Sequence, residues 1–269
     1  MDLSTIKLTI GSGCSFSDTM NWQSYKTWPK QLPDQLGITE WVNEGRGGQA
    51  NNMIRMRTIH AVEKALTKFS KDDILVGVMW SGPDRKGVYY HKDFLGDKPT
   101  GKVWIDGYNF VEGDTEGIWK PFLLGHSGHD NWRLGKLYYK NFHDSIGALV
   151  DTLHDIHYTQ IYLKNKGIKY FMSNAWNIFE FRWDNWGQYK GNIEDYRNEN
   201  IGRHNALNHP DLKWIADSID WKKFLPVEGM WEWCQLYNPE RDYKVDHHPT
   251  QEEHQEFTSQ VIIPFIEQL

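Results

Sequence analysis

Short apolar runs mark the strands that the sequence predicts. Ile6 to Ile10 alternate apolar and polar side chains and then meet Gly11-Ser12-Gly13, which indicates a strand that ends in a tight loop. The run Ile74 to Trp80 is continuously apolar, which is typical of a central parallel strand buried on both faces. Strands are therefore predicted over residues 6–10, 41–43, 74–80 and 170–172.

Stripes of apolar residues at spacings of three and four predict the helices. Ile59, Val62, Leu66 and Phe69 form one such stripe, and similar stripes recur later in the chain. Helices are predicted over residues 28–36, 51–69, 142–166 and 251–267. Gly167 is expected to end the third helix, and Pro264 to kink the last one.

The alternation of strands and helices indicates an α/β fold with a central parallel sheet and helices on both faces. Two long aromatic-rich segments, about residues 82–135 and 177–244, lack clean periodicity and leave the chain after predicted strands. No internal repeat or linker is visible, so residues 1–269 are expected to form a single domain. The two insertions are expected to form a cap at the carboxyl edge of the sheet, where ligands bind in such folds.

Composition excludes several classes of protein. The formal net charge is −6 and no basic stripe is present, which argues against a nucleic-acid partner. No apolar stretch is long enough to span a bilayer and no signal peptide is visible, so we expect a soluble protein without a membrane partner, cytoplasmic or virion-associated. Cys14 and Cys234 are expected to be buried thiols. The oligomeric state is left open.

Tryptophan is the most over-represented residue, with 14 copies, mostly in the two irregular segments. Such rings can form a local core or can stack on sugar faces. Packing in a local core is the favoured interpretation.

The two ends of the chain carry a possible nucleophile and a possible base. Ser15 follows a predicted strand and a glycine-rich loop, and its backbone N–H is a candidate oxyanion donor. His248 precedes the last helix, and Asp246 is placed to orient its ring. We expect His248 to take the proton of Ser15, because a serine hydroxyl is a poor nucleophile without a base.

Three blocks together resemble the SGNH (GDSL-like) hydrolases. Gly13-Cys14-Ser15-Phe16-Ser17 resembles the nucleophile block, in a Gly-Cys-Ser-Phe variant similar to members carried by bacteriophages and marine bacteria. Asn43 to Asn51 resembles the second block, with Gly48 as the oxyanion-hole glycine, and Asp246 to Pro249 resembles the last. The resemblance implies a flavodoxin-like three-layer α/β/α sandwich. It also implies metal-free hydrolysis of an ester or acetyl group, or acyl transfer.

The sequence departs from the family pattern in two places. The family asparagine after the central strand is missing, and Ser81 or Asn174 is the candidate substitute for that oxyanion donor. Asp246 lies two residues before His248, whereas the family aspartate more often lies three before, where this chain has Val245. Arg85, after the same strand, is a candidate anchor for an anionic substrate group, or it ties down the loop.

Two other histidine-containing segments fit a functional site less well. His209-Pro210-Asp211 is a rival histidine-proline site, but no comparable amphipathic helix is predicted to follow it. His126, His129 and Asp130 have a spacing that a metal could use, yet further ligands are not evident, so no metal or other cofactor is expected.

The favoured function is a serine esterase or deacetylase whose substrate is a small-molecule or glycan ester. The alternatives are a catalytically decayed binding or structural module on the same fold, such as a phage-associated protein, and an acyltransferase.

Overall fold

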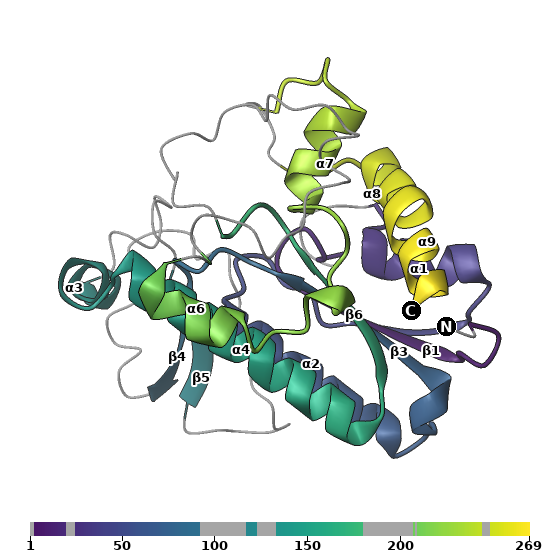
Figure 1. Ribbon diagram of the computed structural model, residues 1–269, viewed down its shortest axis with the longest axis horizontal. Coiled ribbons are helices and arrows are strands. Elements are labelled where there is room, and N and C mark those ends of the chain that lie inside the picture. The colour runs from purple at the N-terminus through teal and green to yellow at the C-terminus, as the bar shows by residue number, and fades with distance from the viewer. Residues whose placement is uncertain are drawn as a thin grey trace.

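The computed structural model describes residues 3–19, 25–91, 117–122, 133–179, 207, 209–243 and 248–269. Within these residues the chain is mixed α/β, with a parallel sheet at its centre (Figure 1). Much of both predicted insertions, including residues 92–116, 123–132 and 180–206, lies outside the described residues. The predicted cap therefore stays a prediction.

The sheet has four parallel strands in the spatial order β2-β1-β3-β6. They are β1 (Leu8–Ser12), β2 (Glu40–Asn43), β3 (Ile74–Trp80) and β6 (Lys169–Asn174). Gly11 of β1 lies opposite Asn43 on one side and Gly77 on the other. The chain leaves β1 towards β2 and then returns to β3, so the gap between the ends of β1 and β3 is a topological switch point, where such sheets bind ligands.

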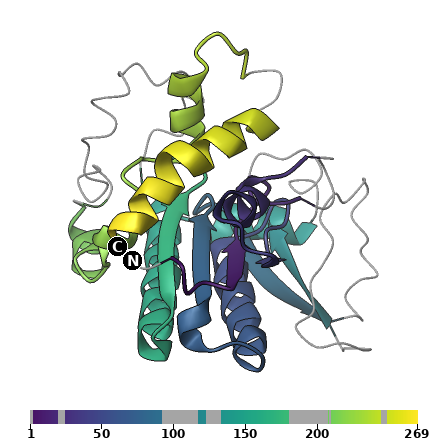
Figure 2. The same cartoon turned by 90° about the vertical axis from the view of Figure 1, so that its right-hand side faces the viewer.

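Helices cover both faces of the sheet, an arrangement compatible with three layers. The long helices are α1 (Trp28–Leu36), α2 (Asn51–Leu66) and α4 (Ser145–Lys166). The C-terminal helix consists of α8 (Gln251–Phe257), a π-helical turn (Thr258–Ile262) and α9 (Ile263–Gln268). In Figures 1 and 2, α2 and α4 lie together on one side of the strands, and α1, α8 and α9 lie on the other.

The predicted strands and long helices are confirmed with small shifts of their ends. β3 is buried at all seven positions, and Gly167 ends α4 with a φ of 70°. β1 runs two residues further than predicted, because Gly11 and Ser12 still pair with β3. In the last helix the π-helical turn ends at Ile262, two residues before Pro264, whose ring cannot fit the regular hydrogen-bond ladder.

The irregular segments contain elements whose bounds the sequence pattern did not define. The Gly, Asp and aromatic residues of about 82–135 indicate hairpin-like pieces, and there β4 (Lys86–His91) and β5 (Gly117–Phe122) form an antiparallel pair. Short helices occur as α3 (Arg133–Asn141), α6 (Pro210–Ala216) and α7 (Met230–Tyr237). Short 3₁₀ turns cover Lys71–Asp73 and Trp221–Lys223.

One prediction about the rival histidine is wrong. A helix does follow His209, because His209 is the N-cap of α6 and its Nδ1 accepts a hydrogen bond from the Asp211 N–H at 3.3 Å. Leu212 and Ile215 bury one face of that helix. His209 therefore has a structural role as a helix cap.

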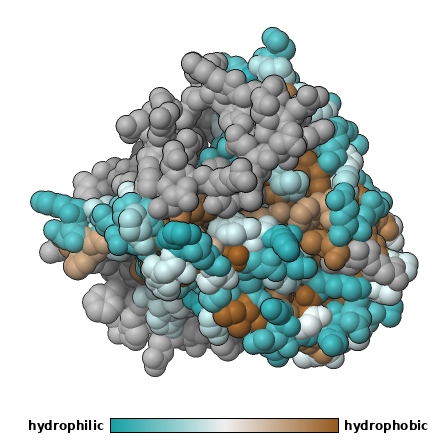
Figure 3. Space-filling model, in the orientation of Figure 1, coloured by the Kyte–Doolittle hydropathy of each residue, from teal (hydrophilic) through white to brown (hydrophobic). Residues whose placement is uncertain are grey.

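One apolar core lies between the sheet and the helices that pack on it. Its largest fully buried side chains include Trp28, Trp80 and Phe171. Both cysteines are free and fully buried, as predicted. The described surface in Figure 3 is mainly hydrophilic with smaller apolar areas, and no helix in the described ranges combines the length and apolar character needed to cross a bilayer.

Candidate active site

Ser15 lies in a tight turn at the carboxyl end of β1. The turn is closed by two hydrogen bonds, from the Ser17 N–H to the Cys14 carbonyl at 2.9 Å and from the Asp18 N–H to the Ser15 carbonyl at 3.3 Å. Gly11 to Asp18 are all buried except Ser15, which is partly exposed. Among Gly11 to Asp18, Ser15 is therefore the residue that is open to solvent, at the carboxyl end of β1.

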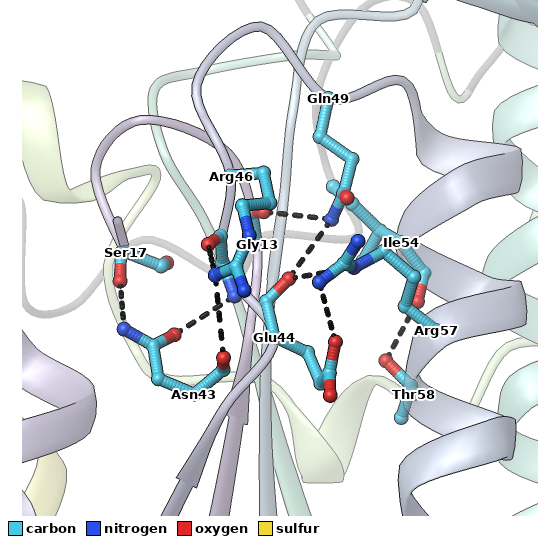
Figure 4. A network of polar contacts seen from close by, with 10 residues as sticks. Gly13, Ser17, Asn43, Glu44, Arg46, Gln49, Ile54, Arg57 and Thr58 are labelled. Carbon is cyan, nitrogen blue, oxygen red and sulfur yellow. Dashed lines mark hydrogen bonds and ion pairs between the residues drawn. The ribbon is translucent and has the colours of Figure 1, made fainter. Parts of the chain in front are cut away.

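The loop after β2 is fastened to this turn (Figure 4). The Arg46 N–H and the Gln49 Nε2 both donate to the Gly13 carbonyl, at 3.2 and 2.9 Å. The Asn43 Nδ2 donates to the Ser17 carbonyl at 2.7 Å, and Asn43 Oδ1 accepts from the Gly45 N–H at 2.8 Å. The first two sequence blocks of the resemblance are thus in direct contact.

This contact is close enough to require glycine. A Cβ on Gly13 would lie 2.3 Å from Ser17 Oγ and 2.9 Å from the Met79 carbonyl oxygen. A Cβ on Gly45 would lie 2.7 Å from the Ser17 carbonyl oxygen. A larger residue at Gly45 would push the loop after β2 away from the Ser15 turn, and a larger residue at Gly13 would push that turn away from β3.

Two backbone N–H groups in these loops are available as donors. Gly47 donates its N–H to the buried carboxylate of Asp18 at 2.8 Å, which orients the glycine loop. Gly48 follows with a φ of 69°, in the left-handed region that favours glycine. Within the described residues, the N–H groups of Gly48 and Ser15 form no hydrogen bond.

The two candidate substitutes for the missing asparagine are both fully buried. The Ser81 backbone exchanges two hydrogen bonds of 2.8 Å with the Asn51 amide, and the Ser81 hydroxyl accepts from Arg85 at 2.7 Å. The Asn174 Nδ2 donates to the Glu228 carbonyl at 3.0 Å. Both side chains are thus held by protein partners at the ends of β3 and β6.

His248, near the C-terminal end of the chain, packs against Phe16, the residue after Ser15. Its ring centroid lies 5.6 Å from that of Phe16. The Phe16 ring also makes edge contacts with Trp176 at 5.8 Å and with Trp231 at 6.5 Å. Both tryptophans are buried and belong with Phe16 to the main apolar core, whereas Trp214 is exposed.

A buried ion pair holds the segment that carries His248. Arg241 donates from Nη1 to the Glu253 carboxylate and from Nη2 to the His248 carbonyl, the latter at 2.7 Å. Glu253 is 1% exposed and also accepts from the Tyr243 hydroxyl and the Thr250 N–H, each at 2.7 Å. We call Arg241, Tyr243 and Glu253 the arginine clamp.

His254 fastens the last helix to α1. Its Nδ1 accepts from the Trp28 N–H at 3.3 Å, which satisfies a donor of the first helical turn. Burial, and to a smaller extent the nearby His248, lower the pKa of His254 to about 3. The His254 ring is therefore neutral at pH 7, with its proton on Nε2.

The structure thus brings Ser15, Gly48 and the His248 segment to one edge of the sheet. Asp246, like His126, His129 and Asp130, lies outside the described residues. The sequence interpretation missed Phe16 and the arginine clamp. Thr250 and Glu253 carry the spacing of a helix capping box, a signal that marks Glu253, whereas no local pattern marks Arg241.

Comparison with protein-family models gave no match for this chain, and comparison with curated proteins gave none either.

Proposed function

We propose that the protein is a serine hydrolase of the SGNH type that cleaves an ester or acetyl group, with an acylated carbohydrate as one candidate substrate. The observation that carries the proposal is the 5.6 Å contact between the rings of His248 and Phe16, the residue next to Ser15. It supports the proposal because the ring of the candidate base packs against the residue next to Ser15, the partly exposed candidate nucleophile, which follows a strand at the carboxyl edge where such folds bind ligands.

In the proposed reaction, the Ser15 Oγ attacks the ester carbonyl carbon while His248 accepts the hydroxyl proton. His248 then returns that proton to the leaving alcohol as the carbon–oxygen bond breaks. Water, activated by His248, attacks the acyl-serine and releases the acid and Ser15. Asp246 is the proposed partner that orients the His248 ring.

The free N–H groups of Ser15 and Gly48 are the proposed oxyanion donors. Their loops are held together by the hydrogen bonds to the Gly13 carbonyl, so the donors are positioned before the substrate arrives. Such preorganisation lowers the barrier because little reorganisation is needed in the transition state.

The flavodoxin-like order of the family is a further part of the proposal. Four sheet strands already follow the order 2-1-3-4. Beyond β6, Phe224 forms a parallel bridge with Met172, and the Leu225 N–H donates to the Met172 carbonyl at 2.8 Å. This short pairing occupies the place of the fifth strand in that order.

The decisive experiment compares two serine substitutions. Ser15→Ala should abolish turnover of a small acetyl ester and covalent labelling by a fluorophosphonate. Ser12→Ala is the matched control, because the Ser12 hydroxyl is fully buried and no reagent reaches it. Unchanged turnover or labelling in Ser15→Ala would refute the proposal.

A binding or structural module on the same fold is the second candidate. It is favoured by the burial of Ser81 and Asn174, whose side chains are held by other protein groups. Loss of one oxyanion donor costs on the order of 10²–10³ in rate. Absence of labelling in the native protein, together with measurable binding of a glycan or protein, would support this candidate.

An acyltransferase would use the same residues and pass the acyl group to an alcohol instead of water. Product analysis with added alcohols or sugars separates the two reactions, because only transfer yields a new ester.

A further inference from the structure

The arginines divide into two groups by their partners. Arg55, Arg57 and Arg241 each form a salt bridge with a carboxylate. Within the described residues, Arg46 and Arg85 form none. These two arginines lie in the loops after β2 and β3, one on each side of β1 and the Ser15 turn.

The Arg85 guanidinium is held in place without being neutralised. Its Nη1 donates to the Ser81 Oγ at 2.7 Å, and its Cζ lies 5.0 Å from the centre of the Trp176 ring. Both supports are neutral, so the full positive charge remains, and Arg85 is partly exposed. A fixed guanidinium with free N–H groups is well suited to bind a carboxylate, phosphate or sulfate.

Arg85 is linked to the candidate nucleophile by two ring contacts. The Trp176 ring that supports Arg85 also packs against Phe16 at 5.8 Å, and Phe16 follows Ser15 in the chain. Arg85 and Ser15 therefore border the same switch point between β1 and β3.

Arg46 adds a second positive charge on the opposite side. Its Nη1 donates to the Gly45 carbonyl at 2.7 Å and to the Asn43 carbonyl at 3.4 Å. These bonds hold the Arg46 side chain beside the Gly48 loop, and among the described residues Arg46 forms no salt bridge.

We propose that the substrate is an anionic ester, and that Arg85 binds its negatively charged group while the ester carbonyl lies at Ser15. The inference rests on the proposed hydrolase function and specifies its substrate class. Arg85 acts as a specificity-determining residue, and Arg46 strengthens the attraction for the anion.

Two matched pairs of substrates test the inference. p-Nitrophenyl hemiglutarate and p-nitrophenyl pentanoate differ in charge on the acyl side, and meta-carboxyphenyl and meta-carbamoylphenyl acetate differ on the alcohol side. The native protein should prefer the anionic member of at least one pair by about tenfold in kcat/KM, because a charge-assisted hydrogen bond contributes to its binding. Arg85→Met should remove that preference. Because Arg85 also holds the Ser81 hydroxyl, the readout is the ratio of kcat/KM between the two members of each pair and not the absolute kcat/KM.

Two variants serve as controls. Lys64→Met makes the same change in net charge on the exposed face of α2, far from the sheet edge, and should keep the preference. Arg85→Lys keeps the positive charge without the planar guanidinium and should keep part of the preference for the anionic ester. A preference that survives in Arg85→Met, or equal kcat/KM within both pairs in the native protein, would overturn the inference.

The failure of this inference is distinguishable from the failure of the proposed function. Labelling of Ser15 by a fluorophosphonate without an anionic preference would leave the hydrolase standing and remove the anion site. If the native protein neither labels nor turns over any ester, the thermal midpoint with added glutarate decides. A rise in the native protein that is absent in Arg85→Met supports the anion site, and no rise in the native protein overturns it.

Discussion

The rings of Phe16 and His248 lie 5.6 Å apart although the two residues belong to opposite ends of the chain. This contact is one of several that join the first turn of the fold to its last segment. The Tyr25 hydroxyl donates to the Pro249 carbonyl, and the Lys26 N–H donates to Gln251 Oε1 at 3.1 Å. The candidate base is therefore placed by packing against the N-terminal segment, and disturbing that packing should affect catalysis.

Replacing Arg241 should destabilise the fold and impair the candidate base. Arg241→Met leaves the Glu253 carboxylate, 1% exposed, without its cation, which typically costs about 3–5 kcal/mol in the free energy of unfolding. It also removes the donor to the His248 carbonyl. In protein that remains folded, we expect kcat to fall while KM changes little, since the base is displaced and the binding loops are not. Urea unfolding and ester kinetics provide the two measurements.

The double variant Arg241→Met/Glu253→Gln is the control for this prediction. It removes both charges of the pair, so it should be more stable than Arg241→Met alone. The single variant Glu253→Gln completes the comparison. If the double variant lost as much stability as Arg241→Met and Glu253→Gln lose together, Arg241 and Glu253 would not act as a coupled pair.

Regular periodicity made most of the framework predictable. The stripe in α4 repeats over several turns, Asp144 caps the helix by accepting from the Ile146 and Gly147 N–H groups, and Gly167 ends it, so local signals agree with the fold. β3 was predictable because a strand covered on both faces carries an unbroken apolar run.

The short helices were not predictable for a physical reason. α6 and α7 have seven and eight residues, which is about two turns and too few for an apolar stripe to repeat. Their positions are set by tertiary contacts, such as that of Trp231 with Phe16 and Tyr243. The sequence pattern alone does not encode those contacts.

The places of candidate site residues were predictable where those residues directly follow a strand of the sheet. Ser15 and Gly48 follow predicted strands, so the parallel topology alone places them at one edge. Arg241 was not predictable, because its hydrogen bond to the His248 carbonyl depends on how the final loop folds back. The Asp246 assignment remains a prediction from spacing.

Two glycine substitutions should have opposite effects. Gly13→Ala places a Cβ 2.3 Å from Ser17 Oγ and 2.9 Å from a backbone carbonyl, so we expect a loss of about 1–3 kcal/mol in unfolding free energy and a strong loss of ester turnover. Gly147→Ala lies inside α4 with open space around the new methyl group, and should gain about 0.5–1 kcal/mol with turnover unchanged. Thermal and urea unfolding measure both. Equal stabilities of the two variants would mean that Gly13 is not packed against Ser17 and Met79 as described.

His254 should make the protein lose stability as the pH falls. Because burial lowers its pKa from about 6.5 to about 3, the unfolded chain binds a proton between these values that the folded chain does not. The free energy of unfolding is therefore reduced by up to about 1.4 kcal/mol per pH unit as the pH falls below about 6.5. His254→Asn keeps an acceptor for the Trp28 N–H but does not titrate, so this part of the pH dependence should disappear.

The measurement is the difference in unfolding free energy between the native protein and His254→Asn at pH 7 and at pH 4.5. The variant should be less stable at pH 7, because it loses the packing of the ring, and the difference should narrow at pH 4.5.

A second buried group, Asp155, also titrates in this range. Burial raises the pKa of Asp155 to about 6 although Arg55 opposes the shift, and this group favours folding at lower pH. Asp155 contributes equally to both proteins and cancels in the difference. A constant difference between the native protein and His254→Asn at the two pH values would mean that His254 is not held neutral.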